Sequence, residues 1–179
     1  QIFTKLMMVK SSILAPIVLF VYNRPEHTKE TLLSLSNNLL AGQSDLIVYC
    51  DGPKPNDSRE TLEAIQRVRS LVNEQDWCKN LEVIIADENM GLANSIIRGV
   101  GEVLKTYGKV IVLEDDLVTS EGFLTYMNEA LIHYEDVDQV MQISAYQYVD
   151  FKENVLHRRT TSWGWGTWKN SWSHFESDT

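Results

Sequence analysis

The chain has 179 residues, of which 44% are hydrophobic and 23% charged, a balance typical of an ordinary soluble domain rather than a disordered or fibrous protein. A chain of this length buries roughly 70% of the surface that it exposes when unfolded, so it needs neither a disulfide nor a structural metal to be stable. Its net charge of −9 repels phosphate backbones and anionic lipids. Nucleic acid and membrane surfaces are therefore excluded as expected partners.

The cysteines and the chain ends bear on the cellular context. Cys50 and Cys78 form neither a Cys-x-x-Cys pair nor a Cys/His pattern, so we interpret both as reduced thiols of a cytoplasmic protein. The apolar stretch at residues 13–22 is too short to span a membrane and lacks a signal-peptide cleavage site. The chain starts with Gln and stops soon after a dense aromatic segment. We expect residues 1–179 to be one domain, truncated at its C-terminus.

Apolar runs alternate with amphipathic stretches along the chain. The periodicity predicts strands at residues 15–22, 45–50, 81–86, 109–113 and 139–144. It predicts helices at residues 27–40, after the N-cap Ser58 through Val72, at residues 91–106 and at residues 120–134. Strands that alternate with helices indicate an α/β fold with a parallel or mostly parallel sheet, and no internal repeat or interdomain linker interrupts the pattern.

Polar residues come directly after four of the predicted strands. They are Asn23 and Arg24, then Asp51 and Gly52, then Asp87, Glu88 and Asn89, and finally Glu114, Asp115 and Asp116. In open α/β sheets, ligands bind at the carboxyl ends of the strands. We therefore expect these side chains to meet at one edge of the sheet and to form a ligand site.

The acidic run Glu114, Asp115 and Asp116 is the strongest single signal for chemistry. Three consecutive carboxylates beside a buried strand repel one another and raise their own pKa values unless a cation neutralises them. Carboxylate oxygens suit Mg²⁺ or Mn²⁺, which share their coordination with substrate phosphates. The alternative is a solvated acidic turn, and the buried strand just before the run favours the metal site.

The other strand-end residues each allow two interpretations. Arg24 suits a phosphate or carboxylate and Asn23 a base or sugar, or they form a surface turn before a proline. Asp51 contacts a ligand or accepts hydrogen bonds from its own turn. Gly91 opens a helix whose amides suit an anion, or is an ordinary turn residue. Neither a P-loop nor a Gly-x-Gly-x-x-Gly motif is present, which excludes the P-loop and NAD-binding classes.

Four of the five tryptophans lie within residues 163–172, and glycines separate the first three of them. Indoles spaced in this way are suited to pack against a sugar ring while each N–H remains free to donate. The alternative is a local aromatic core beneath a loop.

Seven short segments follow one another in a specific order between residues 15 and 172. They read Val-Leu-Phe-Val-Tyr-Asn-Arg, Tyr-Cys-Asp-Gly, Gly-Leu-Ala-Asn, Val-Leu-Glu-Asp-Asp, Phe-Leu-Thr-Tyr-Met, Ile-Ser-Ala-Tyr and Ser-Trp-Gly-Trp. In this order they resemble nucleotide-sugar glycosyltransferases of the GT-A fold, of the N-acetylglucosaminyltransferase I type and the family 2-like sugar transferases. The resemblance implies a Rossmann-like, mostly parallel central sheet flanked by helices.

The resemblance also implies an activity. It predicts transfer of a hexosyl or N-acetylhexosaminyl group from a nucleotide diphosphate donor, most simply a UDP-sugar, to an acceptor hydroxyl with inversion. The cofactor is then Mn²⁺ or Mg²⁺ and the acceptor a saccharide, for example in polysaccharide biosynthesis at a bacterial cell surface.

Carried over position by position, the resemblance makes Asp116 the direct metal ligand and Asp51 a uracil contact. The donor-binding residues that we predict are Asn23, Arg24, Asp51, Asn89, Gly91, Glu114, Asp115, Trp163, Gly164 and Trp165. In the family, the general base lies beyond the tryptophan segment, so we expect it after residue 179. Within the chain, Glu176 and Asp178 are the acids that follow the tryptophans, and Asp178 is the one candidate that we retain.

Two other classes remain open at this stage. A metal-dependent nucleotidyltransferase also uses carboxylates at strand ends, but it releases pyrophosphate where a glycosyltransferase releases a nucleoside diphosphate. A non-catalytic carbohydrate-binding domain would use the tryptophans without metal or nucleotide, and the acidic run argues against it.

Overall fold

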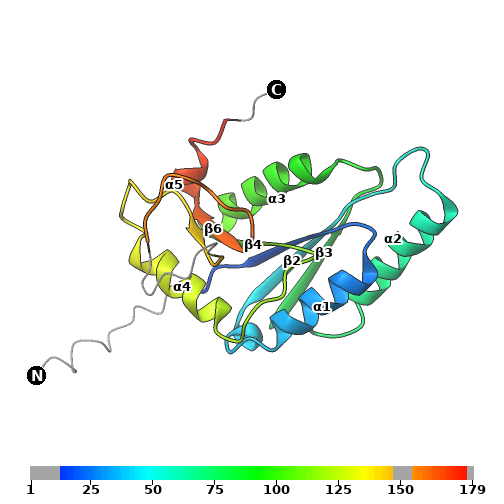
Figure 1. Ribbon diagram of the computed structural model, residues 1–179, viewed down its shortest axis with the longest axis horizontal. Helices are drawn as coiled ribbons and strands as arrows, with labels where there is room; N and C mark the ends of the chain where they lie inside the picture. The colour runs from blue at the N-terminus through cyan, green and yellow to red at the C-terminus, as the bar shows by residue number, and fades with distance from the viewer. Residues whose placement is uncertain (1–12, 147–154, 177–179) are drawn as a thin grey trace, which may run out of the picture.

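In the residues that the computed structural model describes, 13–146 and 155–176, six strands form one sheet with the order β3-β2-β1-β4-β6-β5 (Figure 1). The strands are β1 (Ile17–Val21), β2 (Asp45–Cys50), β3 (Asn80–Ile85), β4 (Lys109–Glu114), β5 (Ile143–Ser144) and β6 (Trp165–Trp168). β1 pairs in parallel with both β2 and β4, and β2 pairs in parallel with β3. β6 runs antiparallel to β4 and β5. The predicted mostly parallel sheet is confirmed.

Helices cover both faces of the sheet (Figure 1). They are α1 (Pro25–Ser36), α2 (Arg59–Val72), α3 (Leu92–Tyr107), α4 (Phe123–His133) and the short α5 (Lys169–Trp172), with a 3₁₀ turn, η2 (Ala41–Gln43). α1, α2 and α4 pack on one face, where they share a core with Ile17, Leu19 and Val21 of β1. α3 packs on the other face, against Val18 and Phe20. Because β1 is buried on both faces, its sequence is apolar without alternation.

The first helix is shorter than predicted. It ends at Ser36, whereas the leucine pattern predicted a helix to residue 40. Asn38 is responsible, because its buried side chain bonds across to other elements: its amide donates to Thr119 Oγ1 at 3.0 Å, and its Oδ1 accepts from the Leu124 N–H at 2.9 Å. The segment after α1 therefore joins α1 to α4 instead of extending the helix.

The predicted strand at residues 139–144 is also wrong in extent, since β5 covers only Ile143–Ser144. A turn precedes it, in which the Val140 N–H donates to the Val137 carbonyl at 2.9 Å. The strand that sequence reasoning missed is β6, which lies inside the tryptophan segment and pairs with β4.

Close packing explains why β6 carries glycine between tryptophans. A Cβ atom on Gly166 would lie 2.9 Å from the Val110 carbonyl oxygen and 3.0 Å from Met127 Cε, so α4 can approach the sheet only over a glycine. Trp165 and Trp168 point to opposite faces of β6 and enter the cores beneath α3 and α4, respectively. The Trp168 indole N–H donates to the Leu131 carbonyl at 3.0 Å. For these two residues, the aromatic-core alternative holds.

Candidate active site

A cavity of about 310 Å³, lined by both polar and apolar side chains, lies at the carboxyl ends of β1, β2 and β4. β1 sits between β2 and β4, and the strand order reverses here: the chain moves outward from β1 to β2 and β3, and then returns through α3 on the opposite face to β4, next to β1. Seven of the predicted donor-binding residues line the cavity: Asn23, Arg24, Asp51, Asn89, Gly91, Glu114 and Asp115. The structure therefore brings together residues from four separate loops, as the strand-end argument predicted.

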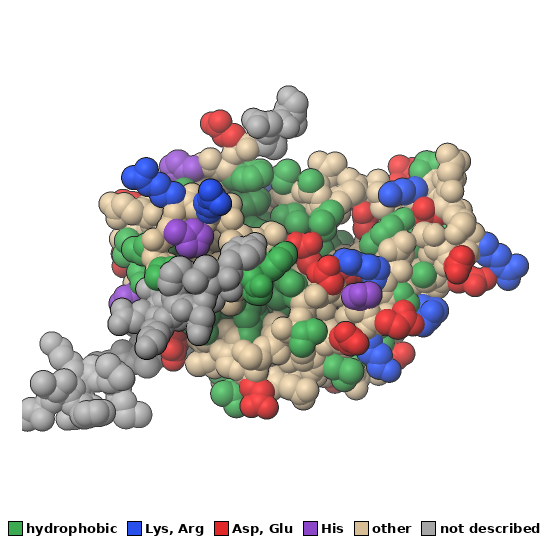
Figure 2. All heavy atoms as spheres, viewed as in Figure 1, with side chains coloured by type: hydrophobic (Ala, Val, Ile, Leu, Met, Phe, Trp, Pro, Cys, Tyr) green, Lys and Arg blue, Asp and Glu red, His purple; other side chains and the backbone are tan. Residues whose placement is uncertain are grey.

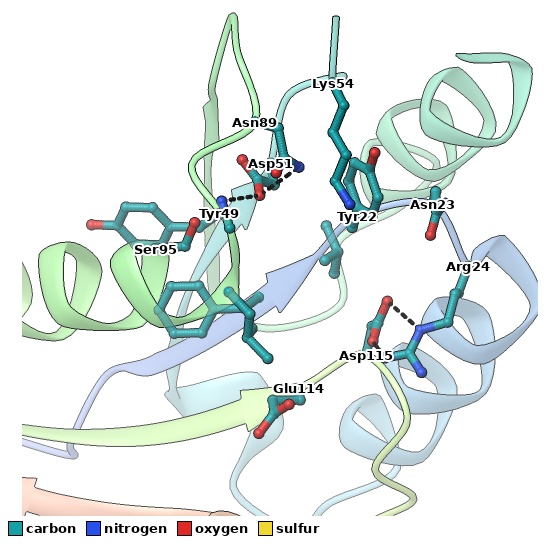
Figure 3. A pocket seen from close by; sticks show the side chains of 14 residues that line it. Tyr22, Asn23, Arg24, Tyr49, Asp51, Lys54, Asn89, Ser95, Glu114 and Asp115 are labelled. Carbon is teal, nitrogen blue, oxygen red and sulfur yellow. Dashed lines mark hydrogen bonds and ion pairs between the residues drawn. The ribbon is translucent and has the colours of Figure 1, made fainter. Parts of the chain in front are cut away.

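Arg24 and the acidic run face each other on one side of the cavity (Figure 3). The guanidinium forms a two-pronged ion pair with Asp115, in which Nε lies 3.3 Å from Oδ2 and Nη2 contacts Oδ1. Its third nitrogen, Nη1, lies 3.1 Å from Asp116 Oδ2. In Figure 2, acidic and basic side chains lie side by side where the end of β4 meets the start of α1. Arg24 is thus a counter-charge to the run, whereas the sequence predicts a metal in this role.

Burial shapes the acid–base behaviour of this run. Burial raises the pKa of Asp115, which is 3% exposed, and the Arg24 guanidinium offsets part of that rise. Burial also raises the pKa of Glu114, and the charges of Asp116 and Asp115 add to the effect. The expected mutual repulsion of the three acids is therefore present at Glu114.

Asp51 and Asn89 form another wall of the cavity (Figure 3). Asp51 Oδ1 accepts from the backbone N–H groups of Gly52 at 2.9 Å and Met90 at 2.8 Å. Asp51 Oδ2 accepts from the Gly91 N–H at 3.1 Å and from the Asn89 side-chain amide at 3.0 Å. Both interpretations of Asp51 are compatible with the structure, because Asp51 lines the cavity and also accepts hydrogen bonds from turn amides.

A second cavity, of about 570 Å³, lies on the other side of the acidic run. It is lined by Asp116 and the loop that follows, by Phe123 and Tyr126 at the start of α4, and by Trp163 and Gly164 just before β6. Gly164 has φ +65°, and a Cβ atom there would lie 3.1 Å from the Phe123 ring, so glycine is required for the chain to turn into β6. Predicted residues from the acidic run and from the tryptophan segment thus share this cavity.

Not every predicted residue reaches a cavity. Trp165 is 8% exposed and lies in the core with Val18, Phe20 and Val112. Its ring stacks on Trp172, with centroids 6.0 Å apart. The candidate base Asp178 lies outside the described residues.

Sequence reasoning missed Tyr22, Lys54 and Ser95, which also line the first cavity. The Tyr22 hydroxyl donates to Asp57 Oδ2 at 2.6 Å, and burial together with this carboxylate raises the pKa of Tyr22 to about 12. The Lys54 ammonium lies 5.9 Å from the centre of the Tyr22 ring. The strand-end rule could have found Tyr22, which directly precedes Asn23. Lys54 comes four residues after β2 and lines the cavity because its ammonium lies near Tyr22, which follows β1.

Protein side chains alone would not complete the coordination of a divalent cation at this site. Among the described residues, no three side chains of His, Cys, Asp or Glu come together to form a metal cage. The Asp116 carboxylate is 42% exposed and borders the second cavity. Mg²⁺ and Mn²⁺ commonly use one or two carboxylates and complete their coordination with water and substrate phosphates. Asp116 fits that role as the one direct protein ligand.

The mostly parallel sheet flanked by helices, with a cavity at its strand ends, is the arrangement of GT-A glycosyltransferases. The chain belongs to glycosyl transferase family 2, whose model matches residues 17–177. This confirms the resemblance seen in the sequence at the level of the family, and the N-acetylglucosaminyltransferase I type stays a prediction.

The solved structures that are similar to this chain include the following two. A mannosyltransferase from Pyrobaculum calidifontis, PcManGT, in complex with GDP-Man and Mn²⁺, is 16% identical with a TM-score of 0.48, over 74% of this chain and 35% of that chain. TarS from S. aureus is 17% identical with a TM-score of 0.45, over 68% of this chain and 20% of that chain. No curated protein matches the chain significantly. None of the helices in the described part is long and apolar enough to cross a membrane.

Proposed function

We propose that this chain binds a nucleotide diphosphate sugar together with Mn²⁺ or Mg²⁺ and transfers the sugar, with inversion, to a hydroxyl of a saccharide acceptor. The observation that carries the proposal is the pair of cavities that meet at the acidic run: Glu114 and Asp115 line the first, and Asp116 lines the second. A donor with its nucleotide in the first cavity would have its sugar near the second. Membership of the family supports the same activity.

The nucleoside suits the first cavity because the walls combine polar side chains with three aromatic rings, Phe20, Tyr22 and Tyr49. Amide and carboxylate groups match the donors and acceptors of a base and a ribose, and the rings offer apolar surface. The sequence resemblance favours uridine as the base.

The diphosphate belongs near Arg24 and Asp116. Arg24 forms ion pairs with Asp115 and Asp116. Its attraction for an arriving diphosphate therefore depends on how far the negative charge of these two carboxylates is neutralised. A divalent ion bound by Asp116 supplies positive charge for the diphosphate as it leaves. In that arrangement, Arg24 offsets part of the cost of burying the Asp115 carboxylate and holds it in place, while Asp116 is free to exchange the guanidinium for the ion.

The acceptor saccharide suits the second cavity. Phe123, Tyr126, Tyr146 and Trp163 contribute aromatic surface to it, and the Trp163 indole is 44% exposed. Aromatic faces pack against the apolar faces of sugar rings, and the hydroxyls around them bind polar groups. The carboxylate that removes the proton from the attacking hydroxyl is expected after residue 179.

Isothermal calorimetry tests the proposal directly. We expect UDP and UDP-sugars to bind the wild-type chain with Mn²⁺ and to bind much more weakly with EDTA. Asp116→Ala should remove this metal dependence, while Asp136→Ala, which changes an exposed aspartate after α4, should retain it. Equal affinity with and without Mn²⁺ would contradict the metal assignment. No binding of any nucleotide in either condition would contradict the donor site.

A further inference from the structure

We infer that Ser95 recognises the base of the bound nucleotide, by donating a hydrogen bond from its hydroxyl to a carbonyl oxygen of a pyrimidine such as uracil. The inference rests on the proposed function, since it concerns how the first cavity binds the nucleotide. Ser95 adds a contact to the donor-binding residues predicted from the sequence and replaces none of them.

The first argument is that the Ser95 hydroxyl is available. Three hydroxyls line the first cavity, those of Tyr22, Tyr49 and Ser95. Tyr22 donates to Asp57 Oδ2 at 2.6 Å, and Tyr49 donates to Glu102 Oε2 at 3.1 Å. Ser95 is only 9% exposed, and among the described residues its hydroxyl has no hydrogen-bond partner. Because buried hydroxyls are nearly always hydrogen-bonded, a ligand in the cavity is the expected partner.

The second argument is that Ser95 does not bond back to its own helix. On α1, the Thr28 hydroxyl donates to the Arg24 carbonyl, four residues earlier, at 2.8 Å. Ser95 stands in the same relation to Gly91, whose carbonyl accepts the Ser95 backbone N–H at 3.0 Å and not its hydroxyl. The usual acceptor for a serine on a helix is therefore left unused, and the hydroxyl stays available on the side of the cavity.

The third argument is the apolar ring surface beside this hydroxyl. Gly99 follows Ser95 by four residues, so the two lie on the same face of α3. A Cβ atom on Gly99 would lie 3.0 Å from the rings of both Phe20 and Tyr49, which stack with their centroids 5.3 Å apart. Both rings line the cavity. A flat, partly apolar group such as a base can pack there while its edge reaches Ser95.

The position of the charged groups assigns this end of the cavity to the base. Arg24 and Asp115 lie across the cavity from Ser95 (Figure 3). The diphosphate belongs near Arg24 and the metal ligand Asp116 in the proposed function. The base is at the opposite end of the nucleotide from the diphosphate, so it belongs on the side of Ser95.

The start of α3 favours a carbonyl oxygen over an amino group as the partner. α3 begins at Leu92, so Ser95 lies at the end of its first turn, and no side chain caps the helix. The uncapped N–H groups of a first turn carry a partial positive charge, which attracts atoms of partial negative charge. Uracil presents two carbonyl oxygens, whereas cytosine has an amino group in place of one of them.

Ser95→Ala tests the inference, with Ser70→Ala as the matched control, since it makes the same substitution at an exposed position of α2. The nucleotides are UDP and two analogues in which sulfur, a weak acceptor, replaces O2 or O4 of uracil. Calorimetry in Mn²⁺ should show that Ser95→Ala binds UDP about 3- to 10-fold more weakly than the wild type. One sulfur analogue should bind the wild type more weakly than UDP by a similar factor. In Ser95→Ala, that analogue and UDP should bind equally to within about 2-fold, because the partner of the altered atom is gone.

Thermal melting of the free protein separates recognition from a structural role. Ser95→Ala removes a hydroxyl that no protein group uses and places a better helix former in α3, so it should melt at the wild-type temperature or above it. The control should match the wild type in nucleotide binding. A lower melting temperature for Ser95→Ala would show that the hydroxyl supports the fold and would overturn the inference.

The binding outcomes are also distinguishable. Unchanged UDP affinity in Ser95→Ala would overturn the inference and leave the proposed function in place. A loss of UDP affinity in which the difference between UDP and the sulfur analogue persists would assign the hydroxyl to another part of the nucleotide, and so would a wild type that binds all three nucleotides equally; both results overturn the contact with the base. A wild-type chain that binds none of the three would instead overturn the proposed uridine donor, and this inference with it.

Discussion

Removing the side chain of Arg24 should destabilise the free protein, because it leaves Asp115 as a buried carboxylate without a cation. Asp115 is 3% exposed and is held by two of the three guanidinium contacts, and the third goes to the exposed Asp116. Hydrogen bonds to charged groups contribute about 1.5–3 kcal/mol each, and loss of one partner of a fully buried pair costs about 3–5 kcal/mol. The Arg24 side chain is 45% exposed, so water can replace part of it.

We therefore expect Arg24→Ala to lower the free energy of unfolding by about 2 kcal/mol, which for a domain of this size lowers Tm by about 4–8 °C. Urea denaturation followed by circular dichroism, without metal or nucleotide, measures the change. A double-mutant cycle with Asp115→Asn isolates the pair: the double variant should lose at least about 1 kcal/mol less than the two single variants together.

Two results would refute this reasoning. If Arg24→Ala unfolds at the same urea concentration as the wild type, the guanidinium is not the counter-charge of the acidic run. If the cycle is additive to within about 0.5 kcal/mol, the two side chains act independently. Glu30→Ala, which removes an exposed side chain from α1, is the control for a change near the same helix.

Three further predictions concern packing and charge. Gly166→Ala should lower the free energy of unfolding measured by urea denaturation by about 1–3 kcal/mol, because the added Cβ atom would lie 2.9 Å from the Val110 carbonyl oxygen. Trp168→Ala should lower the free energy of unfolding by about 3–5 kcal/mol, because this side chain is buried. Trp163→Ala should lower it much less, as thermal melting would show, and should weaken saccharide binding in calorimetry. Folding raises the pKa of Glu114 above its ordinary value of 4.5, so the folded protein favours the protonated carboxyl group. This contribution to stability is complete below the pKa of Glu114 in the unfolded chain and is lost as the pH rises through its pKa in the folded protein. Glu114→Gln should therefore melt at a higher temperature than the wild type at pH 7 and at nearly the same temperature at pH 4, and an equal difference at both pH values would contradict it.

Local patterns were sufficient to predict most of the elements. The apolar run at β1 and the amphipathic spacing of α2 and α3 predicted each to within a few residues, because burial on one or two faces determines which positions must be apolar. The N-cap at Ser58 is confirmed, since its hydroxyl accepts from the Thr61 N–H at 3.2 Å. Errors arose where a side chain bonds to a distant element, as at Asn38, which ends α1 by contacting the start of α4.

Local patterns also predicted where the site lies, but not how its residues pair. The strand-end rule brought Asn23, Asp51 and Glu114 to one edge of the sheet, and they line one cavity. The rule says nothing about partners across that edge. Arg24 and Asp115 are separated by 91 positions, and their contact exists only because β1 and β4 are neighbours in the sheet.

The tryptophan segment shows the same division most clearly. Composition alone determined that it is unusual, and the spacing of Trp163, Trp165 and Trp168 was compatible both with a sugar-binding wall and with a core. The tertiary structure shows core positions for two of them, because pairing of β6 with β4 buries Trp165 and Trp168 on opposite faces. Trp163 lies before the strand, where it lines the second cavity, and its contact with a sugar stays a prediction. A mostly parallel α/β sheet with polar strand ends could be predicted from the amino-acid pattern, since hydrophobic periodicity is a local property of the chain. Which charges neutralise one another and which aromatic rings line a cavity could be seen only in the folded chain, since both depend on contacts between strands that are distant in the sequence.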